Sequence, residues 1–146
     1  MPTLPEVLMD ESKKAAVIDD CCSLIDAEVK DKGGLSGLAI KAGYGAVKGI
    51  KPGFIKQAVT DMLPDFAKAL DPLFQEAKGQ SKPVGDFFAQ NSTRAADALL
   101  TITDARAEKV KSGVVKGTYE KLRGSAKKNV EAAIPRLGKM VEKYGG

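Results

Sequence analysis

Apolar residues recur along most of the chain at the three- and four-residue spacing of an α-helix. The pattern is most regular over residues 114–144, where Pro135 is expected to kink or divide the helix. Runs that alternate between apolar and polar residues, which would predict strands, do not occur. The pattern therefore predicts an all-α protein, a bundle of about six or more helices.

Glycines and prolines predict where the helices begin and end. Gly33-Gly34 and Pro52-Gly53 are expected to end two helices, and the segment from Gly79 to Pro83 reads as a linker. Pro64 and Pro72 predict either short helices laid end to end or one kinked helix. The longer predicted helices cover about residues 11–31, 36–50, 54–63, 92–111 and 114–144.

Two helix starts carry their own capping signals. Thr3 and Glu6 have the spacing of a capping box, with Pro5 in the first turn, and they predict a short helix at the N-terminus. Asp10 is expected to cap the helix over about 11–31.

The segment 36–50 is unusually rich in small residues. Glycine inside a helix costs about 1 kcal/mol relative to alanine, so close approach of a neighbouring backbone is expected to offset its four glycines. We expect this to be the most buried helix, although an apolar helix that lies on a membrane is an alternative. The candidate pocket or helix-packing residues are Gly37, Ile40, Gly43, Tyr44 and Val47, with Tyr119 from the second half of the chain.

The two halves of the chain resemble each other. Residues 53–68 and 124–139 align without a gap and share a Gly, Lys, Val, Pro and Lys at matching positions. Upstream, with small shifts, the order Ser-x-x-Ala-Ala, Asp-Ala, Tyr also repeats, at Ser12, Asp26 and Tyr44 and again at Ser92, Asp104 and Tyr119. Chance in a chain rich in Ala, Gly and Lys is the alternative. We expect one domain, 1–146, that duplicates a three-helix unit as halves 1–79 and 80–146 about a pseudo-twofold axis.

Long stretches of the chain resemble a family of small uncharacterised bacterial proteins of the actinobacterial type. The resemblance rests on DAEVKDKGGLSGLAIKAGYGAVKGIKPG, MLPDFAKALDPLF, ALLTITDARAEK and LRGSAKKNVEAAIPRLG, and it spans nearly the whole sequence. It implies a bacterial, cytoplasmic origin. It implies no activity and assigns no residue roles.

Charge is distributed unevenly over the 146 residues. Residues 1–105 carry 12 Lys/Arg and 15 Asp/Glu, whereas residues 106–146 carry 11 Lys/Arg and 4 Asp/Glu. A basic C-terminal third favours an anionic partner such as nucleic acid, although a solvated helix surface is the more common explanation. The candidate anion-contacting residues are Lys116, Lys121, Arg123, Lys127 and Lys128.

Several common active sites are excluded by composition. The chain has no histidine, so Ser-His-Asp and Cys-His catalysis and histidine-containing metal sites do not apply. Adjacent Cys21 and Cys22 are expected to be small buried residues, with a redox role as the alternative. We therefore predict a protein that is not an enzyme and has no catalytic residue, metal site or cofactor.

Sequence alone leaves three functions open. The first is a scaffold that binds an unknown protein partner, and homo-oligomers are among its expected forms. The second is a carrier of an apolar ligand or lipid, held between the halves or at a membrane surface. The third is nonspecific nucleic-acid binding through the basic C-terminal helix. The N-terminus lacks a basic start followed by an apolar stretch, so we expect a cytoplasmic protein.

Overall fold

The computed structural model describes residues 3–31, 34–49, 53–111 and 113–145, without the side chains of residues 34–36, 39 and 47. These residues form seven helices and, within those ranges, no strand. The helices are α1 (Leu4–Leu8), α2 (Lys14–Asp31), α3 (Gly34–Lys48), α4 (Phe54–Gly79), α5 (Val84–Gln90), α6 (Ser92–Lys109) and α7 (Gly113–Gly145). The predicted all-α bundle is confirmed.

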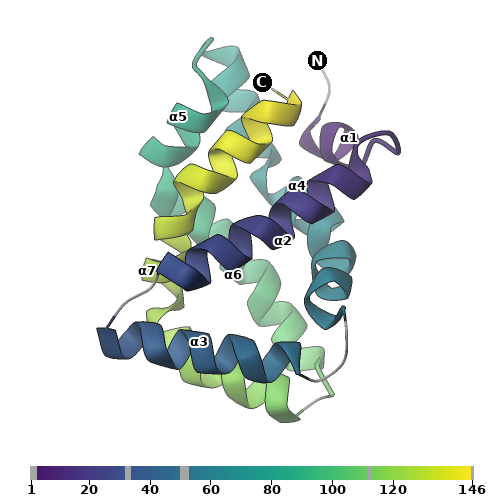
Figure 1. Ribbon diagram of the computed structural model, residues 1–146. Helices are drawn as coiled ribbons and strands as arrows, with labels where there is room; N and C mark the ends of the chain where they lie inside the picture. The colour runs from purple at the N-terminus through teal and green to yellow at the C-terminus, as the bar shows by residue number, and fades with distance from the viewer. Residues whose placement is uncertain (1–2, 32–33, 50–52, 112, 146) are drawn as a thin grey trace.

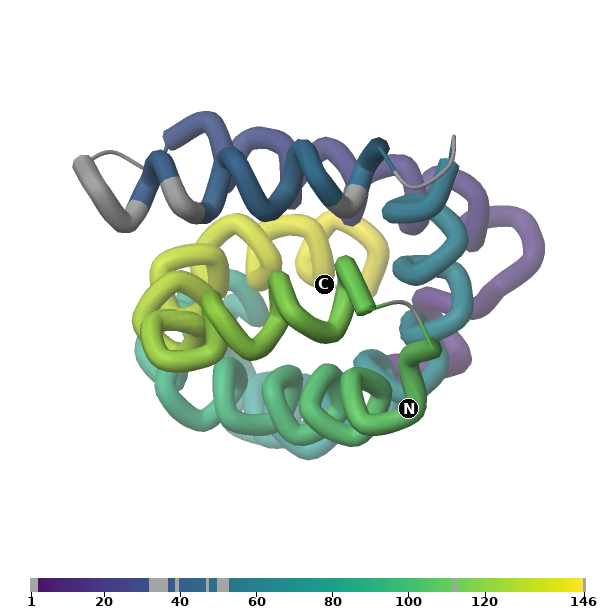
Figure 2. The backbone as a smooth tube through the Cα atoms, turned by 90° about the horizontal axis from the view of Figure 1, so that it is seen from below, coloured from purple at the N-terminus to yellow at the C-terminus, as the bar shows by residue number. Residues whose placement is uncertain are grey.

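The helices form two ends of the molecule. Figure 1 shows α1, α5 and the end of α7 at the top, with α3 and the beginning of α7 at the bottom. Viewed from below, α3 and the first part of α7 run side by side, and α6 lies beyond α7. Figure 2 also shows α4 on one side of this pair, and the later part of α7 (yellow) behind it, between α3 and the first part of α7.

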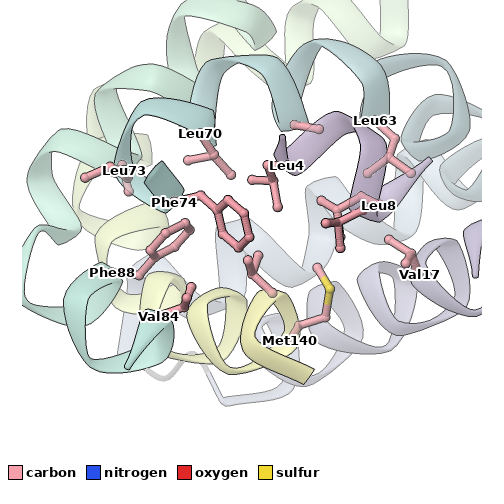
Figure 3. Close-up of a cluster of buried hydrophobic side chains, with 14 of the residues drawn as sticks. Leu4, Leu8, Val17, Leu63, Leu70, Leu73, Phe74, Val84, Phe88 and Met140 are labelled. Atoms are coloured by element: carbon pink, nitrogen blue, oxygen red, sulfur yellow. The ribbon is translucent and has the colours of Figure 1, made fainter. Parts of the chain in front are cut away.

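The hydrophobic core lies towards the upper end. Phe74 and Phe88 are fully buried at its centre, and Leu4 of α1 is buried with them. Figure 3 shows these side chains pointing toward one another from α1, α4 and α5. Short α1 and α5 are therefore held mainly by their apolar side chains, because a helix of this length is marginal by itself.

Both predicted capping residues are used, in different ways. Thr3 Oγ1 accepts a hydrogen bond of 3.2 Å from the backbone N–H of Glu6, as the capping prediction requires. Asp10 instead organises a turn, where its carboxylate accepts the backbone N–H of Ser12 at 2.9 Å. Helix α2 begins only at Lys14, so the predicted start was three residues early.

Prolines do not divide the two long helices. Helix α4 contains Pro64 and Pro72, and α7 contains Pro135, each inside one continuous helix. All three prolines are solvent-exposed. The carbonyl groups that a proline leaves without a helical partner can therefore bind water, which lowers the cost of keeping the helix intact. The alternative of separate short helices over this part of the chain is wrong.

The prediction that residues 36–50 form the most buried helix is also wrong. Among the α3 side chains that the structure describes, only Gly37 is buried, and Leu38 is 66% exposed. The mistake has a physical cause. Small residues make a helix look apolar, but they offer little surface to bury, so the bulkier residues of α4 occupy the core instead.

Candidate functional site

A polar cluster joins α6 to α7. The Tyr119 hydroxyl donates to Asp104, and Thr103 Oγ1 lies 2.7 Å from the same hydroxyl. Arg123 donates to both oxygens of Asp104, from Nε at 2.8 Å and Nη2 at 3.0 Å. The hydrogen bonds from Arg123, then the one from Tyr119, lower the pKa of Asp104. Burial, followed by the bond to Asp104, raises the pKa of Tyr119.

A matching cluster joins α2 to α3. The Tyr44 hydroxyl donates to Asp26, and Lys48 Nζ lies 4.0 Å from the same carboxylate. Burial, with the hydrogen bond to Asp26 second, raises the pKa of Tyr44. A tyrosine with a raised pKa stays protonated at neutral pH, so the hydroxyl serves as a hydrogen-bond donor that ties two helices together.

Other contacts between helices also occur in pairs, one within residues 1–79 and one within residues 80–146. Lys56 of α4 pairs with Asp19 of α2 at 3.5 Å, and Lys127 of α7 pairs with Asp97 of α6 at 3.3 Å. Each short helix is also held by a carboxylate. Asp71 accepts the N–H of Leu4 at 2.8 Å, and Glu142 accepts that of Gly85 at 3.3 Å.

Ion pairs also connect the halves, from Arg94, Arg106, Arg136 and Lys143 of the second half to acidic residues of the first. Arg136 of α7 binds Glu28 of α2, with Nη1 to Oε1 at 2.9 Å. Arg106 of α6 lies 3.6 Å from Asp65 of α4 and donates to the carbonyl oxygen of Asp61 at 3.0 Å. Arg106 is thereby fixed against α4.

A cleft lies between α4, α6 and the beginning of α7. We call it the α4–α6–α7 cleft, and its volume is about 360 Å³. The Tyr119 ring and Phe54 belong to its wall, and Thr103 and Arg106 add polar groups. It is lined by Phe54, Gln57, Ala58, Asp61, Met62, Thr103, Arg106, Ala107, Val110, Val115 and Tyr119. The wall is mostly apolar and few polar groups converge on it, as in small-molecule sites.

A second, smaller space lies deeper, between the two predicted halves of the chain. We call it the seam cavity. Its volume is about 140 Å³, and every side chain that lines it is apolar or a cysteine. Leu63 and Phe66 of α4 face it from the first half, and Leu99 of α6 and Ile134 of α7 from the second.

The candidate pocket residues of the sequence do not form one site. Gly43 packs against α7, since a Cβ placed there would lie 2.8 Å from Thr118 Cγ2. Tyr119 lines the α4–α6–α7 cleft, whereas Tyr44 lines a separate hollow beside α2. The other three are Gly37, which is buried, Ile40, which is half-buried, and Val47, whose side chain lies outside the described residues.

The candidate anion-contacting residues are also divided. Arg123 and Lys127 are engaged with Asp104 and Asp97 in the ion pairs described above. The side chains of Lys116, Lys121 and Lys128 are exposed. The sequence therefore overestimated the positive charge that α7 offers to a partner.

Neither cysteine is set up as a nucleophile. Cys21 and Cys22 are half-buried and free. Burial raises the pKa of Cys21 to about 12 and also raises the pKa of Cys22. The expectation that both are fully buried is too strong, but the raised pKa values keep the thiols protonated, which disfavours reactivity.

Sequence reasoning missed the polar partners of three tyrosines. The helical periodicity of residues 114–144 does not indicate that the hydroxyls of Tyr119 and Tyr144 donate to Asp104 and to Asp20, and nothing in it indicates the bond from Tyr44 to Asp26. A signal was present for two of the three tyrosines, because the predicted repeat aligns Asp26 and Tyr44 with Asp104 and Tyr119.

Within the part of the chain that the structure describes, no group of three or more cysteine or acidic side chains is arranged to hold a metal ion. Over those same residues, no helix is long and apolar enough to cross a membrane.

Comparison with known proteins identifies the family but no relative of known activity. No curated protein and no solved structure matches the chain. The match to a family covers residues 4–145, which takes in all seven described helices. The chain belongs to the family of unknown function DUF6918.

Proposed function

We propose that this protein is not an enzyme but binds a small, mostly apolar molecule in the α4–α6–α7 cleft. The observation that carries the proposal is the cleft itself. Its volume of about 360 Å³ falls within the range of roughly 300–1,000 Å³ typical of small-molecule sites. The seam cavity, at about 140 Å³, is below that range and suits at most a ring the size of benzene.

The polar groups of the cleft favour a ligand with one polar end. Arg106 is held in place by the Asp61 carbonyl and by Asp65, so it presents its remaining N–H groups in a fixed position. Thr103 and Tyr119 line the same cleft, and their hydroxyls bind each other beside Asp104. An apolar body against Phe54 with a carboxylate or hydroxyl near Arg106 would use both kinds of surface.

We also propose that the chain is an internal duplication. The pair Asp26–Tyr44 has its counterpart in Asp104–Tyr119, and a cation four residues after each tyrosine contacts the same carboxylate. The ion pairs of Lys56 and Lys127 and the hydrogen bonds of Asp71 and Glu142 add two further correspondences. The matching residues lie 78 positions apart between α2 and α6, 75 between α3 and the first part of α7, and 71 between α4 and the later part of α7.

Burial supports the same mapping. Leu63 and Ile134 are both fully enclosed, and Pro64 and Pro135, which follow them, are both exposed. One predicted match does not hold, because Ala15 and Ala16 are exposed whereas Ala95 and Ala96 are buried. When α2 is aligned with α6 so that Asp26 matches Asp104, Ala95 and Ala96 match Val17 and Ile18, which are also buried.

The duplication separates structural from functional residues. Contacts that occur in both halves stabilise the fold. A ligand site that is present in one half only depends on residues that differ from their counterparts in the other half. Phe54 and Met62 of the cleft correspond to the smaller Ser125 and Ala133, and Arg106 corresponds to an acidic residue, Glu28. These differences lie in the cleft, which supports its assignment as the binding site.

Titration with an environment-sensitive fluorescent probe, an apolar ring system that carries a sulfonate, tests the proposal. Ala58→Trp adds bulk inside the cleft, and Ala16→Trp adds the same bulk to an exposed site on α2. We expect wild type and A16W to bind the probe and A58W to lose at least about tenfold in affinity, equivalent to about 1.4 kcal/mol. Equal binding by a folded A58W variant, or no binding by wild type, would overturn the proposal.

The other two functions have less support. Two of the five cations proposed to contact nucleic acid already pair with Asp97 and Asp104. A protein partner, predicted first from the sequence, stays a prediction, because the contacts described here lie within one chain.

A further inference from the structure

The lower end of the molecule exposes apolar side chains. Leu38 of α3 is 66% exposed and Val114 of α7 is 52% exposed. They lie on the two helices that run side by side at this end (Figure 2), which touch where Gly43 packs on Thr118 and Leu122. Single exposed apolar side chains are common on protein surfaces, so the surroundings of these two decide what they indicate.

Small residues make the surface around them flat. On α3 the exposed residues Leu38, Ala42, Gly45 and Gly49 follow one another at helical spacing and so share a face. On α7 the exposed glycines Gly113, Gly117 and Gly124 do the same. We call this surface the lower face: Leu38, Lys41, Ala42, Gly45, Gly49, Gly113, Val114, Gly117, Lys121 and Gly124.

Packing inside the chain does not account for these glycines. A Cβ at Gly45, Gly117 or Gly124 would meet nothing within 4 Å. Glycine inside an exposed helix costs about 1 kcal/mol relative to alanine, and no close neighbour offsets that cost at these three positions, in contrast to Gly43 of α3 and Gly138 of α7. Close packing between the described residues therefore does not explain glycine at these positions.

The charge of the lower face decides between partners. Lys41 and Lys121 are exposed within it and Lys116 lies beside it, whereas residues 34–48 contain no acidic residue at all. Glu120 is the one acidic residue of 113–123, and it is exposed on the same face of α7 as Gly117 and Gly124, so three lysines face one carboxylate. A second copy of the same cationic face would be repelled, whereas an anionic lipid surface would be attracted, by about 1 kcal/mol for each basic residue near it.

We propose that the lower face docks on an anionic lipid bilayer, with Leu38 and Val114 inserted among the headgroups and the lysines against them. Docking would bring the α4–α6–α7 cleft near the membrane, because Val115 and Tyr119 of the same part of α7 line that cleft. The use of docking to load the cleft rests on the function proposed above, but docking itself does not.

Vesicle sedimentation tests the docking. The probes are vesicles of phosphatidylcholine alone and of phosphatidylcholine with about a third phosphatidylserine. We expect wild type to sediment with the anionic vesicles only, and less at high salt. The double variant Leu38→Glu/Val114→Glu should bind them at least tenfold more weakly. The control, Ala16→Glu/Ala89→Glu, adds the same charges at exposed sites on α2 and α5 and should bind within about twofold of wild type.

Three results would overturn the proposal: no binding to the anionic vesicles, equal binding by the L38E/V114E variant, or a wild-type dimer in solution that this variant converts to a monomer. The last would assign the lower face to a second copy. The two proposals fail separately. A58W should still bind vesicles, and L38E/V114E should still bind the fluorescent probe in solution.

Discussion

Replacement of Gly138 by alanine would test how α5 packs on α7. A Cβ at this position would lie 2.9 Å from Phe88 Cβ, 3.0 Å from the Gly85 carbonyl oxygen and 3.2 Å from Gly85 Cα. These neighbours include the backbone of α5, which cannot turn aside as the end of a flexible side chain can. Gly124, on the same helix, is the matched control, because a Cβ there would meet nothing within 4 Å.

The expected effect follows from the difference between the two sites. Alanine favours the helix over glycine by about 1 kcal/mol at both positions. Only Gly138→Ala adds an overpacking cost, of about 1–3 kcal/mol. The free energy of unfolding of G138A should therefore lie about 1–3 kcal/mol below that of G124A, which for a chain of this size corresponds to roughly 2–12 °C in Tm.

Thermal unfolding followed by circular dichroism measures this difference. G124A should melt above wild type by about 2–4 °C, and G138A should melt below G124A. If G138A melts at the same temperature as G124A or above it, α5 does not approach α7 as closely as described, and the reasoning is refuted.

The remaining predictions concern titratable groups and one hydroxyl. Because Asp104 has a lowered pKa in the folded protein, its stabilising effect is complete above its unfolded pKa of about 3.9 and is lost as pH falls through the folded pKa. The difference in unfolding midpoint between wild type and Asp104→Asn should therefore shrink below about pH 4, and a difference that stays constant down to about pH 2 would contradict the lowered pKa of Asp104. In a Cys22→Ser variant, Cys21 should react with a disulfide reagent at pH 8 about a thousandfold more slowly than after unfolding in urea, because its pKa is about 12; an equal rate would contradict its burial. Tyr119→Phe should cost about 1 kcal/mol in urea unfolding through the lost hydrogen bond, and an unchanged midpoint would count against that bond.

Helical periodicity was enough to predict the fold class. It did not predict where helices end or how deeply they are buried, because the effects of proline and glycine on a helix depend on their surroundings. Pro64 ends a helix only when its freed carbonyl is buried, and the sequence does not say which side faces water. Glycine-rich segments are ambiguous in the same way. Gly43 allows a close helix contact, whereas Gly45 on the same helix faces open space.

The candidate site was harder to predict than the fold. Phe54 and Tyr119 are 65 positions apart and meet only because α4 and α7 are brought together by the core. No local sequence pattern predicts that two residues so far apart in the chain line the same cleft. The aligned pairs of aspartate and tyrosine were visible in the proposed repeat, but the sequence alone does not show that Asp104 and Tyr119 are in contact.

The ion pairs between the halves bear on how the halves recognise each other. Under the proposed duplication, Glu28 is the counterpart of Arg106, and Arg136 is the counterpart of Asp65, so the two equivalent pairs have opposite polarity. If two copies of the first half associated in the same way, Glu28 would face Asp65. Two copies of the second half would place Arg106 against Arg136. At these two positions each half would therefore repel a second copy of itself and attract the other half, as expected if an ancestral symmetric dimer lost the ability to self-associate once its two copies were joined in one chain.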